Sequence, residues 1–470
     1  MWRVTPIHTP WGYWLEEAGP VTPEPPLEGD LDADVVIAGG GYTGMWTAWW
    51  LTEHAPDVRI VLLEAELAGH GPSGRNGGFC TSLWDDLAPM RERFGNDAAL
   101  AVARASSAAV DGVGEWCSRQ GVDAWYRAAP HLVVSAAPAQ DGAWDEAVAA
   151  CAEVGEPQEY VALSQDEVRA RCDSPVFRGG AMMRSGASVQ PARLSLGLRA
   201  KLLERGVQIC EHSPVRRLEP APDGSVIAET PGGRVRAGAG VLATGGAMAD
   251  VKGLRRRLTV ASSHIVLTEP VPDVLDEVGW TGGEPIADAR AFLHYFRTTN
   301  DDRIVFGWAG GRLAYGGQTR GRIEVDPAVT KQAARDLVRT FPQLRGRRIT
   351  HAWGGPIDVS PTHLPMFGTL PGRRVHYSVG YTGNGVAPSH LAGQVLASLA
   401  LDRRDEITRL PLVDPPPVHV PPEPFRWVGG EIIRAATLRK EAAEERGEEP
   451  SAVSSFVSRV PKMMGVHIGR

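Results

Sequence analysis

The sequence has no long apolar runs. No stretch offers about 18 uninterrupted apolar residues, so we expect no transmembrane segment. The opening residues, MWRVTPIHTPWGYW, lack the continuous apolar core of a signal peptide. Together these two absences predict a cytoplasmic protein.

Paired cysteines and an excess of basic residues are also missing. No Cys-x-x-Cys pair occurs among the five cysteines, Cys80, Cys117, Cys151, Cys172 and Cys210. This pattern argues against a disulfide framework and against a metal site, and it favours buried thiols in a reducing compartment. Asp and Glu number 56 and Lys and Arg 49, so the net charge is −7. An acidic chain of this kind argues against nucleic acid as a partner.

Glycine, proline and tryptophan, in contrast, are abundant. The chain has 54 Gly, 37 Pro and 14 Trp, and tryptophan outnumbers both Phe (10) and Tyr (8). Hydrophobic residues make up 43% and charged residues 22%, which is ordinary for a folded protein. A length of 470 residues predicts several domain-sized units.

The first clear structural signal is a glycine-rich turn after a buried strand. The apolar run Asp34–Ala38 is typical of a parallel strand, and it leads into a turn with Gly39, Gly41 and Gly44. A helical segment and a second apolar strand follow, and the strand ends before Glu64. In this context the glycines leave room for a pyrophosphate at the helix N-terminus, and Glu64 can accept hydrogen bonds from a ribose. The pattern predicts a dinucleotide-binding unit.

Three further glycine-rich segments follow along the chain. They are the loop Gly71–Gly78, the turn Val241–Gly246 and the loop Val379–Val386. With the first unit, they resemble the FAD-dependent oxidoreductases of the D-amino-acid oxidase, glycine oxidase and sarcosine oxidase superfamily, above all its gamma-glutamylputrescine-oxidase-like branch. The resemblance extends to about residue 405 and implies FAD as the cofactor.

The resemblance also implies cofactor-binding residues that are spread over the chain. They are Gly39, Gly41, Gly44, Glu64, Ser73, Arg75, Asn76, Gly77, Gly78, Val215, Thr244, Gly245, Gly383, Asn384, Gly385 and Val386. No cysteine follows Cys210, whereas sarcosine-oxidase-like members attach flavin to a later one, so we expect noncovalent FAD. Those members also have a lysine in the closing loop, where this chain has Ala387. The electron acceptor, oxygen or another, therefore stays open.

The substrate side is defined less sharply. The resemblance implies that two strands, Phe292–Thr298 and Arg303–Trp308, face the flavin. Side chains alternate along a strand, so His294 and Tyr295 point to opposite faces, and the sequence does not indicate which face lines the pocket. The candidate catalytic residues are His294, Tyr295, Trp308 and, on a neighbouring strand, His264.

The predicted fold class is α/β, with an α+β substrate domain. An irregular arm (1–33) precedes a Rossmann-like FAD-binding domain that is discontinuous in sequence, formed by 34–90, 186–262 and 350–405. Segments 91–185 and 263–349 form a mainly antiparallel-sheet substrate domain. Residues 406–470 are expected to be a proline-rich connector and a charged, solvated tail.

These features predict an enzyme that oxidises the C–N bond of a small amine or amino acid to an imine by hydride transfer to FAD. Two alternatives keep the cofactor: a dehydrogenase that feeds a quinone or a partner protein, and an oxidase of an unusual amine in a biosynthetic pathway. A third alternative is an FAD-binding subunit without catalysis of its own. The sequence leaves the substrate, the acceptor and the oligomeric state open.

Overall fold

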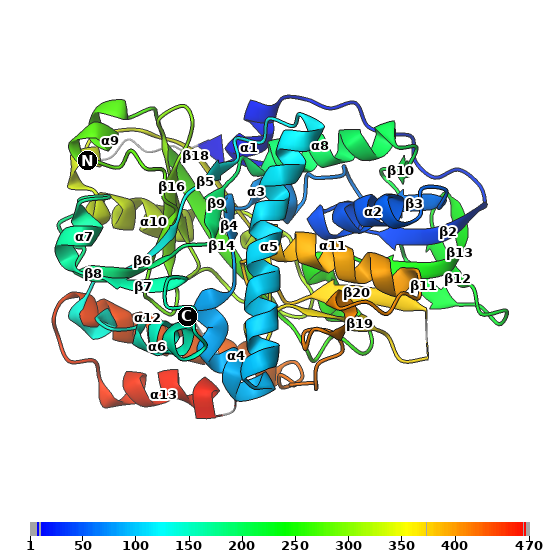
Figure 1. Ribbon diagram of the computed structural model, residues 1–470. Coiled ribbons are helices and arrows are strands. Elements are labelled where there is room, and N and C mark those ends of the chain that lie inside the picture. The colour runs from blue at the N-terminus through cyan, green and yellow to red at the C-terminus, as the bar shows by residue number, and fades with distance from the viewer. Residues whose placement is uncertain (1–6, 9–10, 373, 464, 467–470) are drawn as a thin grey trace.

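Two β-sheets of different kinds organise the chain (Figure 1). The computed structural model describes residues 7–8, 11–372, 374–463 and 465–466. Figure 1 shows α2, α8 and α11 gathered beside the smaller sheet and α9 and α10 beside the larger one, with α5 running between the two halves. No helix within the described ranges is long and apolar enough to cross a membrane.

The smaller sheet has a parallel centre. Its order is β10-β3-β2-β13-β12-β11, and β20 also pairs with β13. The parallel strands are β2 (Leu31–Ala38), β3 (Ile60–Leu63), β10 (Gln208–Cys210), β13 (Gly233–Leu242) and β20 (Val375–Val379). Antiparallel neighbours are β11 (Arg217–Pro220), β12 (Val226–Thr230) and β19 (Met366–Thr369).

The larger sheet has nine strands and is mainly antiparallel. In spatial order they are β1 (Ile7–His8), β18 (Ile349–Val359), β14 (Thr259–Thr268), β17 (Ile304–Trp308), β16 (His294–Thr298), β15 (Ile286–Asp288), β6 (His131–Ser135), β8 (Gly179–Met183) and β7 (Tyr160–Leu163). A small third sheet joins β4 (Phe79–Thr81), β9 (Gly186–Ser188) and β5 (Arg127–Ala128). This arrangement matches the predicted α/β class with a discontinuous parallel-sheet part.

Helices cover both sheets. The principal ones are α2 (Tyr42–His54), α5 (Asn96–Gln120), α8 (Pro191–Glu204), α10 (Pro327–Thr340) and α11 (Val386–Ala400). Shorter ones are α1 (Gly12–Ala18), α3 (Pro72–Arg75), α4 (Leu87–Phe94), α6 (Asp145–Glu153), α7 (Gln165–Arg169) and α9 (Pro272–Glu277). The indoles of Trp46 and Trp49 in α2 meet that of Trp116 in α5 edge-on, with ring centroids 5.0 and 5.5 Å apart. These tryptophans therefore belong to the core between helices.

The strands favour other positions for two predicted domain boundaries. Both β14 and β18 lie in the larger sheet, whereas the boundaries at 262 and 350 assign part of each to the FAD-binding domain. A boundary inside a strand would divide residues that share one hydrogen-bonded ladder. We propose instead that the FAD-binding segments end before β14 and resume after β18.

The C-terminal region is ordered, unlike the solvated tail expected from its charge. It forms α12 (Phe425–Glu445) and α13 (Ala452–Met463), which pack together below the larger sheet in Figure 1. Glu441 is buried and accepts a hydrogen bond from the Ala291 amide at 2.7 Å. Glu445 forms ion pairs with Arg290 and Arg339. The charged run therefore supplies buried partners for the larger sheet.

The N-terminal arm also contains regular structure. Helix α1 lies against α3, α8 and β18, and its Trp14 side chain is fully buried. The Trp14 indole N–H donates to the Asn76 carbonyl at 2.9 Å, and Glu17 pairs with Arg193 at 2.6 Å. The described part of the arm thus ties the Gly71–Gly78 loop to the larger sheet.

The close crossing of α2 and α11 requires glycine at 393. A Cβ there would lie 2.5 Å from the Trp46 Cβ and 2.7 Å from the Trp46 carbonyl carbon. We expect Gly393→Ala to lower the free energy of unfolding by about 1–3 kcal/mol, because the added methyl group overpacks the crossing. Gly429→Ala in α12 is the matched control, since a Cβ at Gly429 meets nothing within 4 Å. This control should gain about 0.5–1 kcal/mol in chemical denaturation. Equal effects of the two changes would contradict the proposed packing constraint.

Candidate functional site

The turn between β2 and α2 is shaped by glycines. Gly39 has φ +110°, and a Cβ on it would lie 2.5 Å from the Ala243 carbonyl oxygen. A Cβ on Gly44 would lie 2.0 Å from the Gly39 carbonyl oxygen. Gly41 precedes α2 and provides no side-chain cap. The helix therefore begins at the carboxyl edge of the parallel sheet with an N-terminus suited to an anionic group.

Glu64 follows β3 and lies beside this turn. Its two carboxylate oxygens accept hydrogen bonds from the Gly40 amide at 2.7 Å and the Glu66 amide at 2.9 Å. Burial raises the pKa of Glu64, and these amides act in the opposite direction. Each oxygen retains a lone pair, so the group can also accept a hydroxyl of a ribose. Its position agrees with the predicted role.

The Gly71–Gly78 loop packs directly on the start of α2. Ser73 Oγ accepts from the Tyr42 amide at 2.8 Å. The Asn76 side chain donates to the Ser73 carbonyl at 2.9 Å and accepts from the Gly78 amide at 2.7 Å. Ser73 and Asn76 thus shape the loop from within. These hydrogen bonds stay within the loop, and Gly77 has no side chain. The main chain at Gly77 can therefore approach a ligand closely.

Arg75 is buried in the same loop, but its charge is paired. Its guanidinium donates to the Gly71 carbonyl at 3.3 Å and forms an ion pair with Glu324, also at 3.3 Å. Trp353 donates to the Arg75 carbonyl at 2.7 Å. The predicted cofactor-binding residue is thus at the site, with a carboxylate already beside it.

Two other predicted segments meet this loop system. Gly245, with φ +55°, follows Thr244 in the turn after β13, next to Gly39. Val215 is half-buried between β10 and β11 and packs on the core of the smaller sheet. Neither Thr244 nor Val215 has a side-chain contact here that assigns it a role. Their cofactor contacts stay predictions.

The closing loop before α11 is bonded to both earlier loops. The Tyr381 hydroxyl shares hydrogen bonds with Thr43 in α2 at 2.7 Å and with Ser378 at 2.6 Å. Asn384 accepts from Thr81 at 3.2 Å. Gly383, with φ +87°, and Gly385 complete the turn, and α11 begins at Val386. Four sequence-distant segments therefore converge on one site.

Asp358 supports the closing loop and was not predicted from the sequence. Its carboxylate accepts from the Gly380 amide at 2.6 Å, and its carbonyl accepts from the Thr382 amide at 2.9 Å. Thr382 has φ +53°, which is unusual for a residue with a side chain. Burial raises the pKa of Asp358 to about 6. No motif signals this residue, because its role depends on a contact across 22 positions.

Tyr295 is on the face of the larger sheet that meets the loops. A Cβ at Gly77 would lie 2.8 Å from the Tyr295 ring, and Phe79 meets that ring edge-on at 5.7 Å between centroids. The Tyr295 and Ser263 hydroxyls share a hydrogen bond of 2.8 Å. Burial raises the pKa of Tyr295, so the phenol stays protonated near neutral pH.

The other three catalytic candidates are on the opposite face. His264, Trp308 and His294 are cross-strand neighbours on β14, β17 and β16, so their side chains share a face. That face is turned away from Gly77, toward α10. Trp308 donates to the Phe292 carbonyl at 3.1 Å, and a Cβ at Gly354 would lie 2.5 Å from the His264 ring. These three side chains thus do not face the glycine loops, and their predicted catalytic roles are not supported by this arrangement.

His294 is part of a buried ion cluster. Its ring nitrogens are 2.8 Å from Asp288 and 3.1 Å from Asp336. Burial lowers the pKa of His294, but the two carboxylates outweigh it and the net shift is upward. Together with Arg290, which lies 3.0 Å from Asp288, the imidazole therefore compensates the carboxylates buried between α10 and β15.

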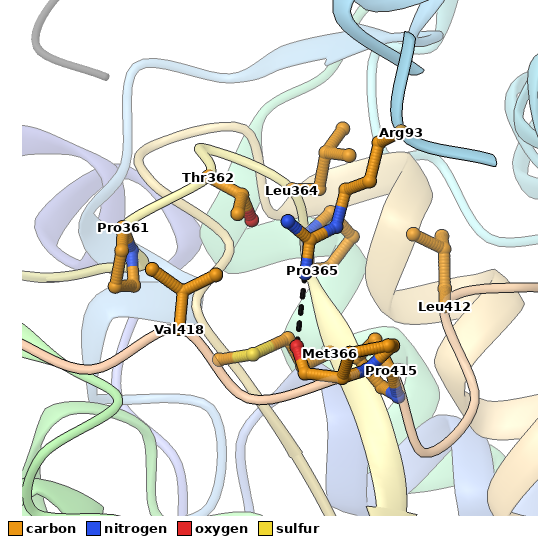
Figure 2. A pocket seen from close by; sticks show the side chains of 10 residues that line it. Arg93, Pro361, Thr362, Leu364, Pro365, Met366, Leu412, Pro415 and Val418 are labelled. Atoms are coloured by element: carbon orange, nitrogen blue, oxygen red, sulfur yellow. Dashed lines mark hydrogen bonds between the residues drawn. The ribbon is translucent and has the colours of Figure 1, made fainter. Parts of the chain in front are cut away.

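Figure 2 shows a small surface pocket whose lining residue Met366 lies beside the closing loop, 3.4 Å from where a Cβ on Gly380 would be. Pro361, Leu364, Met366 and Val418 are among its lining residues, and Arg93 donates to the Pro416 carbonyl at 2.9 Å. Its volume of about 10 Å³ is sufficient for one water molecule. No cluster of three potential metal ligands occurs in the part of the chain that the structure describes.

The raised pKa of Asp358 predicts a pH-dependent stability. The folded protein binds this proton more tightly than the unfolded chain does, since the pKa is about 6 against 3.8. The contribution to stability is therefore full below pH 3.8 and is lost as the pH rises through 6. Relative to Asp358→Asn, the wild type should lose about 2 kcal/mol of unfolding free energy between pH 4 and pH 7. Denaturation of both proteins across this range is the measurement. A difference in unfolding free energy between the two proteins that stays constant across this pH range would contradict the prediction.

Comparison with known proteins agrees with this geometry. The chain is 27% identical to gamma-glutamylputrescine oxidoreductase from Escherichia coli over 85% of its length and 91% of that protein. It is 25% identical to a probable oxidoreductase OrdL from Haemophilus influenzae, over 87% of this chain and 90% of that protein. Glycine oxidase from Geobacillus kaustophilus has a similar fold, with a TM-score of 0.66, 19% identity and coverage of 82% of this chain and 98% of that one.

The match to a family model covers most of the chain. It spans residues 34–399, from β2 to the last turn of α11, and its description is FAD-dependent oxidoreductase. This range includes every loop that converges on the site. The chain belongs to the DAO family of FAD-dependent oxidoreductases.

Proposed function

We propose that this protein oxidises the C–N bond of a small amine or amino acid to an imine, which then hydrolyses. The observation that supports this most directly is the Tyr295–Ser263 pair, which faces Gly77 within the converging loops. A relative of similar length is a gamma-glutamylputrescine oxidoreductase, and similar folds include glycine oxidase and L-proline dehydrogenase. These activities are those of the named proteins, and the similarity favours an amine substrate for this chain.

The residues present fit FAD. Positions 39 and 44 leave no room for a Cβ, and Gly41 precedes α2 without a side chain that could cap the helix. The pyrophosphate would be held there, the adenosine ribose by Glu64, and the ring system by the main chain at Gly77 and the Gly383–Val386 loop. When bound, FAD supplies a two-electron acceptor for hydride from the carbon next to the amine nitrogen.

The chain's own part is to orient the amine and exclude water. Tyr295 can donate or accept a hydrogen bond while its phenol stays protonated, so it is a positioning group and not a base. Phe79 and Tyr295 form aromatic walls that suit an amine, because their ring faces attract a cationic nitrogen before it loses its proton.

Positive charges near the site bear on the identity of the electron acceptor. Arg75 is paired with Glu324, and Ala387 is completely buried in the first turn of α11. Neither position supplies an unpaired positive charge to stabilise a reduced oxygen species. Peroxide production during turnover will separate an oxidase from a dehydrogenase that passes electrons to a quinone or a protein.

Anaerobic bleaching of the bound flavin by a panel of primary and secondary amines and amino acids tests the proposal. We expect at least one amine to bleach it, and Tyr295→Phe to slow bleaching by that amine about 10- to 100-fold. His294→Gln is the matched control, because it should cost about 3–5 kcal/mol of stability and leave the bleaching rate of the folded enzyme nearly unchanged. Bleaching by 2-hydroxy acids alone would contradict the amine substrate, and no bleaching at all would favour an FAD-binding subunit.

A further inference from the structure

The buried arginines differ in how their charges are compensated. In the part of the chain that the structure describes, five arginines are less than a tenth exposed. Four have a carboxylate partner: Arg75 with Glu324 at 3.3 Å, Arg199 with Glu211 at 2.9 Å, Arg290 with Asp288 at 3.0 Å and Arg426 with Glu423 at 2.7 Å. The fifth is Arg297 on β16, which is 2% exposed. Among the described residues, it has no carboxylate oxygen within 4.0 Å.

Neutral groups satisfy the hydrogen bonds of Arg297. Its guanidinium donates to the Gly77 carbonyl at 2.8 Å, to the Val189 carbonyl at 2.5 Å and to the Thr298 carbonyl at 3.3 Å. The central carbon of the Arg297 guanidinium, Cζ, is 4.9 Å from the centroid of the Trp14 ring. Burial lowers the pKa of Arg297 to about 9, so the group is still cationic at neutral pH. Each of its three nitrogens thus donates to a main-chain carbonyl, but its charge is not neutralised.

This charge lies directly behind the loop expected to contact the FAD ring. A Cβ on Gly78 would be 2.5 Å from the Arg297 guanidinium. In the same turn, the main-chain carbonyl of Asn76 accepts a hydrogen bond from the Trp14 indole N–H at 2.9 Å. The turn Asn76–Gly78 is therefore held from one side by Arg297 and Trp14. Tyr295, on the same face of β16, packs against Gly77.

A buried unneutralised cation is costly unless another charge balances it. Two-electron reduction of FAD with uptake of one proton adds one negative charge to the bound cofactor. We propose that Arg297 is a positioning residue that holds the Asn76–Gly78 turn and whose charge is balanced by FAD on reduction. The inference rests on FAD as the cofactor and not on the proposed amine, since any chemical reductant adds the same charge.

The proposal predicts that Arg297 favours the binding of reduced FAD over the binding of oxidised FAD. In Arg297→Met this preference should fall about tenfold or more, so the midpoint potential shifts to more negative values. Titration with dithionite and a reference dye measures the potential without any amine. Failure of the amine panel would therefore leave this result unaffected.

Arg426→Met is the matched control. Arg426 is also buried and donates to two main-chain carbonyls, those of Arg255 and Leu258, but it is paired with Glu423 and lies in α12. Its loss should lower the thermal unfolding temperature and leave the flavin potential unchanged. A potential that is unchanged in Arg297→Met as well, with only thermal stability reduced, would overturn the charge role and leave a structural one.

Arg297→Lys keeps the charge and loses the forked hydrogen bonds. Burial lowers the pKa of a lysine, so its charge should be lost at a lower pH than that of arginine. We expect the potential of Arg297→Lys to match the wild type near pH 6 and to fall below it as the pH rises toward 9. Parallel pH profiles for the two proteins would overturn the proposal, even where Arg297→Met fails to fold or to retain FAD.

Discussion

The site depends on how closely the main chain of β2 and α2 can approach that of β13. Gly39 and Gly44 meet carbonyl oxygens at distances that no Cβ could tolerate. Because the turn is this tight, α2 starts at the carboxyl edge of the parallel strands, where β13 and β20 also end. The loops after those strands are thereby brought to the N-terminus of α2. Tyr381 and Thr43 complete this junction with one hydrogen bond.

Around this junction, most buried charges are paired. His294 is held between Asp288 and Asp336, and Arg75 beside Glu324. The C-terminal helix α12 takes part in the same way, since Glu445 reaches Arg290 from outside the region that matches the family. Pairing of this kind neutralises these buried charges within the protein. It distinguishes Arg297, which faces the cofactor loop with neutral acceptors only.

The two faces of the larger sheet therefore have different tasks. The face with Tyr295 and Ser263 meets the glycine loops and is available for chemistry. The other face, with His264, Trp308 and His294, packs toward α10. Residues only one position apart on β16 thus belong to separate environments, and His294 lies among buried carboxylates and not beside the glycine loops.

The sequence alone determined the family, the cofactor and the glycine loops expected to bind it, because short-range spacing controls how a strand, a glycine turn and a helix follow one another. Gly39, Gly41, Gly44 and Glu64 are all within one such unit. Strand alternation likewise separated His294 from Tyr295. Which face meets the cofactor loops, and the roles of Asp358 and Arg297, were decided by the tertiary structure alone. They depend on contacts between residues 22 and 220 positions apart, and such contacts leave no local pattern in the chain.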